Sequence, residues 1–172
     1  MADVRTLFAR ALELRFEDGM ESSFSRDLVE LIRTEGSNAL EAIANLIADE
    51  ATNTEVAGEA LRWLGYMDDA ATRRDRLGLL LDSLLSPHMR VRDGALLGIA
   101  AIDDPAALPA LRDALVREAS PSLREDIEQV IEQLAGDACY RRGLAQRQRG
   151  NESAPAEGTG AHSRSIPEEV CE

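Results

Sequence analysis

The sequence predicts an all-α fold in which pairs of helices stack into a short solenoid. Four separate segments place apolar residues at steps of four, the spacing that keeps side chains on one face of a helix. Equivalent residues of these segments lie 32, 35 and 32 positions apart, which is the range of helix-pair repeats. Aromatic residues make up only 3% of the chain, so packing must rest on aliphatic side chains, which suit close-packed helices better than a β-sandwich.

An amphipathic helix is expected over residues 3 to 16, ahead of the repeats. Its apolar side chains share one face at helical spacing: Val4, Leu7, Phe8, Ala11 and Leu12. Glu17, Asp18 and Gly19 then break the pattern. We expect residues 1–19 to pack on the repeat array or to cap it.

Four first helices of the repeat units share one buried stripe, within a repeat domain over residues 20–136. The stripe residues are Phe24, Leu28 and Ile32, then Val56, Ala60 and Leu64, then Val91, Ala95 and Ile99, and finally Leu123, Ile127 and Ile131. Second helices carry apolar rows of their own: Leu40, Ile43, Leu46 and Ile47, then Leu77, Leu80, Leu81 and Leu84, then Leu108, Leu111 and Leu115. No single helix can bury such a row alone, so neighbouring units must stabilise one another.

The turns repeat as well. Five residues after each of the first three stripes stand Ser37, Asp69 and Asp104, whose oxygens can accept the free N–H groups at the start of a helix. Pro105 follows Asp104 at a position where its missing N–H costs nothing. The pairs Ser86–Pro87 and Ser120–Pro121 show the same combination of a cap and a proline at the starts of the third and fourth first helices.

Beyond the repeats the pattern fades. Gly136 and Asp137 stand where a turn is expected, and residues 137–149 carry one apolar anchor and several arginines, which predicts a degenerate final helix. Residues 150–172 are rich in Gly, Ser, Pro, Ala and Glu, and such a segment cannot offset the entropy of ordering. We expect a disordered tail there.

The chain is acidic, with 32 Asp and Glu residues against 19 arginines, no lysine and a net charge of -13. Such a surface repels nucleic acid and favours a protein partner with a basic surface. The start of the chain lacks a signal peptide's apolar core, and no apolar run has the length of a membrane span, so we expect a cytoplasmic protein that does not bind membranes. Cys139 and Cys171 form no metal-ligand spacing.

The sequence offers no catalytic, cofactor-binding or metal-ligating residue. Neither His88 nor His162 has a companion nucleophile or acid at a familiar spacing, and we interpret His88 as an exposed residue. The acid pairs at 68–69 and 103–104 fall in equivalent turns, so caps explain them better than a cation site does.

Two features could mark a binding surface. Trp63 and Tyr66 cluster at the end of the second unit's first helix, where the third unit has Gly98 in place of the indole. The ring could fill the space that the glycine leaves, or it could anchor a partner. The other feature is a set of arginines that either form a solvated, paired face or recognise carboxylates; they are Arg73, Arg74 and Arg76.

The run VRDGALLGIAAIDDPAALPALRDAL, followed by SLREDIEQVIEQL, resembles the HEAT repeat, and in particular the short bacterial HEAT-like repeats also found in phycobilisome lyases. The resemblance covers roughly residues 52–135 and, more weakly, 24–51. It implies a right-handed α-solenoid of about four helix pairs, the last one degenerate, with the second helices on the concave side and a surface that binds other macromolecules.

These observations predict a non-catalytic protein-binding or scaffold module that is a monomer or a weak dimer. One alternative is an inhibitor or immunity-type protein that masks a basic partner. A bilin lyase-isomerase is a further alternative, by analogy with the repeat subtype alone. DNA glycosylases built from HEAT-like repeats need a basic groove, which the acidic charge balance does not favour.

Overall fold

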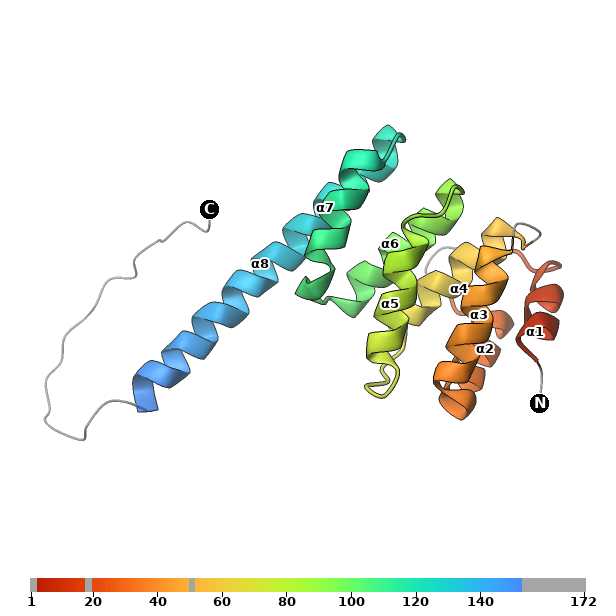
Figure 1. Cartoon of the computed structure of the whole chain (residues 1–172). Helices are drawn as coiled ribbons and strands as arrows, with labels where there is room; N and C mark the ends of the chain where they lie inside the picture. The colour runs from red at the N-terminus through yellow and green to blue at the C-terminus, as the bar shows by residue number, and fades with distance from the viewer. Residues whose placement is uncertain (1–2, 18–19, 50–51, 153–172) are drawn as a thin grey trace, which may run out of the picture.

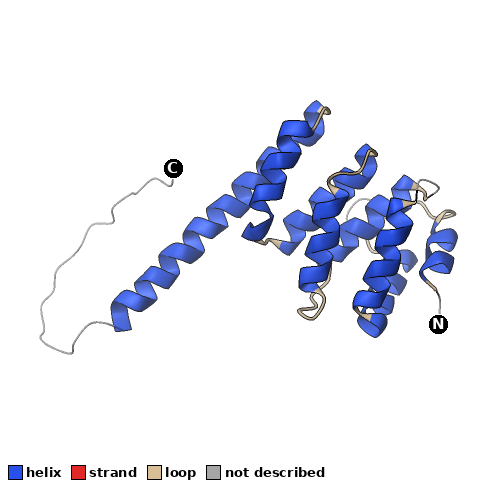
Figure 2. Ribbon diagram, viewed as in Figure 1, coloured by secondary structure: helices blue, strands red, loops and turns tan. Residues whose placement is uncertain are grey.

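The computed structural model describes residues 3–17, 20–49 and 52–152, with side chains up to residue 136. Over these residues the chain is helical and contains no strand (Figures 1 and 2). The elements are α1 (Val4–Ala11), α2 (Ser23–Glu35), α3 (Ser37–Ala48), α4 (Thr54–Tyr66), α5 (Arg73–Ser83), α6 (Met89–Ile102), the short 3-10 helix η1 (Pro105–Ala107), α7 (Leu108–Arg117) and α8 (Pro121–Glu152).

The helices form two layers. The first helices α2, α4, α6 and α8 follow one another in one layer, and the second helices α3, α5 and α7 lie across them in the other (Figure 1). Each first helix contacts the next one, and α3 contacts α5. The predicted all-α solenoid is therefore confirmed. At the N-terminal end α1 packs its apolar face against α2 and α3.

The core follows the predicted stripes closely. The stripe residues of α2, α4 and α6 are all buried, as are Leu123 and Ile127 of α8. Ile131 departs from the prediction, because it is only partly buried while Val130 and Leu134 enter the core. The reason is that α8 packs against α6 and α7 on one side only, so its buried face is narrower than that of an internal helix.

The turns agree with the sequence in part. Asp104 caps η1 by accepting a hydrogen bond from the backbone N–H of Ala106 at 3.0 Å, and Pro105 takes the first position as predicted. Ser37 is not a cap: it is already the first residue of α3, and Gly36 precedes it with a φ of 59°. Glycine adopts this left-handed region without strain, which lets α2 and α3 meet in a single residue.

Serine and proline mark the two other turns in different ways. Pro121 is the first residue of α8, as predicted. In the preceding unit the helix α6 begins two residues after Pro87, and the Ser86 hydroxyl accepts from the backbone N–H of His88 at 3.2 Å. Ser86 thus orders the loop and is not itself the cap of α6.

Both ends of the array differ from the expectation. The helix α1 is shorter than predicted, and Leu12 lies beyond its last residue and is exposed. The turn expected at Gly136–Asp137 is absent, because α8 continues without a break through this point (Figure 1). A lone glycine costs a helix only about 1 kcal/mol, so it does not end one by itself. The start predicted for the disordered tail is wrong, because α8 includes residues 150–152; the rest of that tail, residues 153–172, lies outside the described residues.

Glycines bring α4 and α6 into backbone contact. A Cβ atom added to Gly94 would lie 2.2 Å from the carbonyl oxygen of Gly58, and one added to Gly65 would lie 2.3 Å from that of Gly98. No side chain fits at such separations, so these two first helices pack along a seam that only glycine permits. This seam fixes the second and third units relative to each other.

Candidate docking groove

A groove of about 550 Å³ lies between α2 and α4, in the layer of first helices. Trp63 and Tyr66 form its aromatic wall. Its full lining is Glu21, Arg26, Asp27, Val29, Glu30, Arg33, Trp63, Tyr66, Met67 and Asp68. Two residues that the sequence marks as partner-binding candidates, Trp63 and Tyr66, therefore line the same groove.

A buried carboxylate fixes the indole of Trp63. Its Nε1 donates a hydrogen bond to Oε1 of Glu59 at 2.6 Å. Glu59 is buried one turn earlier on α4, and its second oxygen lies 3.6 Å from Nη1 of Arg62. A hydrogen bond to an ionised acceptor is short and directional, so the ring is held in one orientation while part of it stays open to solvent.

Tyr66 extends the aromatic surface toward solvent. Its ring centroid lies 5.6 Å from that of Trp63, with an angle of 54° between the ring planes. The side chain is 57% exposed, although a ring of this size is usually covered. The two rings give α4 an apolar surface that is open to solvent at its C-terminal end.

Trp63 does not occupy the space beside Gly98, although its indole is partly buried and packs against the core. The site next to Gly98 is already occupied by the carbonyl oxygen of Leu61 and by the side chain of Leu80, at 2.6 and 2.7 Å from a Cβ placed there. The glycine lets two helices touch, and the indole lies on the other side of α4, toward α2.

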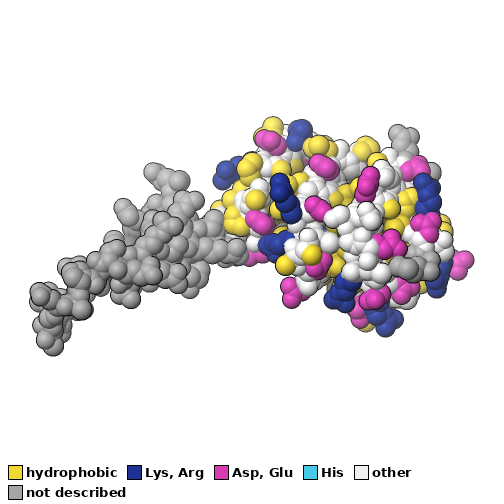
Figure 3. Space-filling view, turned by 60° about the horizontal axis from the view of Figure 1, so that its bottom comes forward, with side chains coloured by type: hydrophobic (Ala, Val, Ile, Leu, Met, Phe, Trp, Pro, Cys, Tyr) yellow, Lys and Arg dark blue, Asp and Glu magenta, His cyan; other side chains and the backbone are white. Residues whose placement is uncertain are grey.

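The rim of the groove is charged. Four carboxylates line it, from Glu21, Asp27, Glu30 and Asp68, against two arginines. All six charged side chains are exposed. On the face seen in Figure 3, acidic side chains and arginines are likewise interspersed, and the arginines do not gather into one patch.

Arg73, Arg74 and Arg76 do not form a single recognition patch. Arg73 donates a hydrogen bond from Nη2 to the carbonyl of Ile102 at 2.8 Å and lies 3.6 Å from Asp104, so it joins α5 to the following unit. Arg74 is exposed one residue further on. Their different surroundings follow from their different positions around α5.

Arg76 is a structural residue, which corrects its prediction as a partner-binding candidate. Only 1% of it is exposed, and it donates hydrogen bonds to the carbonyls of Leu64 and Asp69 and to the Thr72 hydroxyl. Burial lowers the pKa of its guanidinium, against the opposing effect of the Asp69 charge. Sequence could have revealed this, because Arg76, Leu80 and Leu84 are spaced by four and share the core-facing side of α5.

Asp69 organises the same turn from its surface. Its carboxylate accepts from the Thr72 hydroxyl and from the backbone N–H groups of Ala71 and Thr72. These hydrogen bonds, the one from Thr72 first, lower the pKa of Asp69. The predicted capping role of this acid is wrong, because the cap position of α5 is Thr72, and Asp69 instead orders the turn that precedes the helix.

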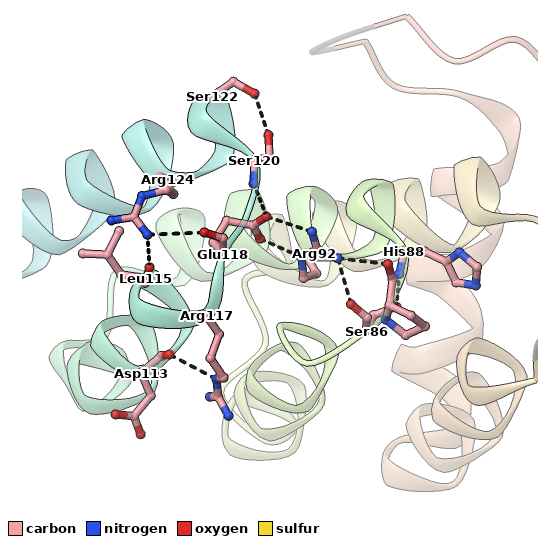
Figure 4. Close-up of polar contacts among 11 residues, drawn as sticks. Ser86, His88, Arg92, Asp113, Leu115, Arg117, Glu118, Ser120, Ser122 and Arg124 are labelled. Atoms are coloured by element: carbon pink, nitrogen blue, oxygen red, sulfur yellow. Dashed lines mark hydrogen bonds and ion pairs between the residues drawn. The ribbon is translucent and has the colours of Figure 1, made fainter.

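Sequence reasoning missed a second polar cluster, which joins the loops of two units (Figure 4). Arg92 holds Glu118 with two hydrogen bonds, Nε to Oε2 at 2.7 Å and Nη2 to Oε1 at 2.9 Å, and it also donates to the carbonyl of Ser86. Glu118 is buried and accepts a further bond from the N–H of Ser120. The Arg92 hydrogen bond is the main cause that lowers the pKa of Glu118.

The position of Glu118 explains why it was missed. It stands two residues before Ser120, as Leu84 stands two residues before Ser86, and both residues are buried. A glutamate at a repeat position that is otherwise apolar does not predict a buried ion pair unless the partner, here Arg92, is also known. His88 is exposed at the edge of this cluster, as predicted (Figure 4).

The described part of the chain contains neither a metal-binding cluster nor a membrane-spanning helix. Among its side chains no group of three or more His, Cys, Asp or Glu residues is arranged to hold a metal ion. None of its helices combines the length and the apolar character needed to cross a membrane.

Stacked helix pairs with aliphatic stripes define a helical repeat protein. The family model for HEAT repeats matches residues 40–132, which is more than half of the chain. The chain therefore belongs to the HEAT-repeat family. No curated protein and no solved structure shows significant similarity to it.

Proposed function

We propose that this protein is a non-catalytic interaction module that binds a protein partner with a basic surface in the groove between α2 and α4. HEAT repeats are generally protein-interaction scaffolds and typically non-catalytic. Beyond this general role, we place the binding site in the α2–α4 groove and expect the partner's surface to be basic.

The observation that carries the proposal is the fixed, open indole of Trp63 beside the exposed ring of Tyr66. Tryptophan and tyrosine are the residues that most often dominate binding energy at interfaces, because they bury a large area at a small entropic cost. A ring held in place before binding loses little further freedom on association. Trp63 has this arrangement because Glu59 already orients it.

Charge supports a basic partner. The four rim carboxylates and the net charge of -13 attract positively charged surfaces over long range. At short range, an arginine or lysine of the partner can lie on an aromatic face while its charge meets a rim carboxylate. The two rim arginines, Arg26 and Arg33, then set the register of the partner by repelling its other basic residues.

Affinity capture from the source cells tests the proposal with three forms of the full chain. The wild type and Val116→Ser should recover the same basic protein, because Val116 is 83% exposed on α7, away from the groove. Tyr66→Ser removes one ring from an exposed position and should reduce recovery by about tenfold or more. Equal recovery with Tyr66→Ser, or a stoichiometric partner that is acidic, would overturn the proposal.

An inhibitor would bind its partner through the same charged rim. The partner's own activity distinguishes an inhibitor from a scaffold. Adding the protein to the captured partner should leave the partner's own activity intact if the module is a scaffold. Stoichiometric loss of that activity would instead assign the inhibitor role.

A further inference from the structure

A second groove, of about 510 Å³, lies between α3 and α5 in the other layer of helices. The N-terminal ends of these helices are joined, because the hydroxyl of Ser37 donates a hydrogen bond to Oδ2 of Asp75. The groove runs along their C-terminal halves, with Ala57 and Val91 of the first helices also in its lining. It thus lies at the opposite end of the two helices from the Ser37–Asp75 hydrogen bond.

The groove is mainly apolar. Ile47 on α3 and Leu79 on α5 are half-buried along its walls, and Leu85, in the turn after α5, is 61% exposed. Ala44 and Ala48 on the α3 wall are small, so the walls leave room for a large side chain between them. A leucine-rich surface that remains open in this way gains free energy when a partner covers it.

Its charge has one sign. Among the described residues the lining has two carboxylates, from Asp49 and Asp82, and one imidazole, from His88, but no arginine, although the chain has 19. The contrast with the α2–α4 groove is clear, because that groove mixes arginines with its acids. A cationic side chain next to an apolar one would match this lining, whereas an anionic segment would be repelled.

We propose that the groove between the C-terminal halves of α3 and α5 is a second docking site, which binds an extended segment of a partner protein carrying a large aliphatic side chain beside an arginine or lysine. The aliphatic side chain occupies the space between Ile47 and Leu79 and is covered by Leu85. The cationic side chain pairs with Asp82. The site is independent of the α2–α4 groove, because the two linings share no residue.

A peptide selection on the full-length protein tests this proposal. Random dodecapeptides displayed on phage are selected against the folded chain, and the recovered peptides are synthesised and measured by fluorescence anisotropy. We expect sequences in which Leu, Ile or Met stands next to Arg or Lys. A selection that returns no binders, or binders without this combination, would overturn the proposal.

Substitutions then locate the binding. Leu85→Ser should weaken it about tenfold, because a buried leucine contributes at least that much, and Asp82→Asn should weaken it about two- to fivefold. Val116→Ser, which also replaces an exposed aliphatic side chain by serine but on α7, and Tyr66→Ser in the other groove should leave it unchanged. Unaltered affinity with Leu85→Ser, or an equal loss with Val116→Ser, would refute the site.

Methyl NMR gives a readout that does not depend on a variant. On peptide addition the methyl signals of Leu79 and Leu85 should shift, while those of Leu97, which is partly exposed on α6 and lies outside the lining, should stay in place. Shifts confined to residues elsewhere would contradict the proposal even if the peptide binds. Loss of partner capture by Tyr66→Ser alone concerns only the α2–α4 groove, so the two proposals can fail separately.

Discussion

The indole Nε1 of Trp63 donates a hydrogen bond to the buried carboxylate of Glu59, one helical turn earlier on α4. Trp63 therefore lines the α2–α4 groove and at the same time satisfies a buried polar group. A substitution of Trp63 should change the free energy of unfolding as well as binding in the groove.

Trp63→Phe should destabilise the fold by about 1–3 kcal/mol, because it keeps an aromatic ring but leaves one oxygen of a buried carboxylate without its donor. Tyr66→Phe is the matched control: it also removes one polar group from a ring of the same pair, but at an exposed position, and should cost less than about 0.5 kcal/mol. Urea unfolding followed by circular dichroism measures both. Equal stability of the two variants would show that the Glu59 contact has no energetic role.

Gly94→Ala should destabilise the protein by roughly 3 kcal/mol, at the upper end for overpacking, because its Cβ would lie 2.2 Å from a backbone oxygen of α4. Backbone cannot rotate away as a side chain can. Gly78→Ala in α5 is the control, since nothing lies within 4 Å of its Cβ, and it should stabilise the helix by about 0.5–1 kcal/mol. Thermal unfolding of the pair should move in opposite directions, and a neutral Gly94→Ala would contradict the backbone seam.

Glu118 should make stability depend on pH in the acid range. Its pKa in the folded protein lies below the ordinary value of 4.5, so the unfolded chain binds more protons than the folded one in that window. The stabilisation is fully present above about pH 4.5 and is lost as the pH falls through the folded pKa. Unfolding free energies measured from pH 3 to 7 should show this decline.

Removing the carboxylate should flatten that profile. Glu118→Gln should cost about 1–3 kcal/mol at pH 7 and less in acid, because Arg92 loses its ionised acceptor. Glu125→Gln makes the same chemical change on the exposed side of α8 and should leave the unfolding free energy at pH 7 within about 0.5 kcal/mol. A Glu118→Gln profile parallel to that of the wild type would rule out this coupling.

Arg76→Leu should destabilise the fold by about 3 kcal/mol or more, since three buried or partly buried oxygens lose their donor at once. Arg74→Leu places the same substitution two residues earlier on the exposed side of α5 and should change stability by less than about 0.5 kcal/mol. Differential scanning calorimetry of both variants decides whether Arg76 is structural. Similar transition temperatures for the Arg76→Leu and Arg74→Leu variants would show that the hydrogen bonds of Arg76 do not stabilise the fold.

The fold was largely predictable, because a buried stripe such as Ile32, Leu64 and Ile99 depends only on local helical spacing and on the repeat period. The sequence predicted less where a contact between units sets the outcome. Nothing near Gly98 in the sequence shows that α4 approaches it with its backbone, so the sequence left open whether Trp63 fills the space of this glycine or anchors a partner. The turn predicted at Gly136 was wrong because a single glycine is a weak helix breaker.

The candidate site was predictable only in part. Trp63 and Tyr66 are visible from the sequence as large rings at helix positions where the third unit has Gly98 and Ala101. The groove beside them depends on α2, whose exposed acids such as Asp27 look like any solvated helix face. Arg76 could have been assigned to the core from its step of four to Leu80, a signal that its neighbours Arg73 and Arg74 concealed.

The glycine seam between α4 and α6 also limits how this array can change. Repeat proteins commonly lengthen or shorten by gaining or losing whole units, which requires that neighbouring units be interchangeable. Gly58 and Gly65 of the second unit meet Gly94 and Gly98 of the third, so a unit inserted between them would need glycines at matching positions on both of its surfaces. The junction between these two units therefore accepts fewer sequences than one that side chains fill.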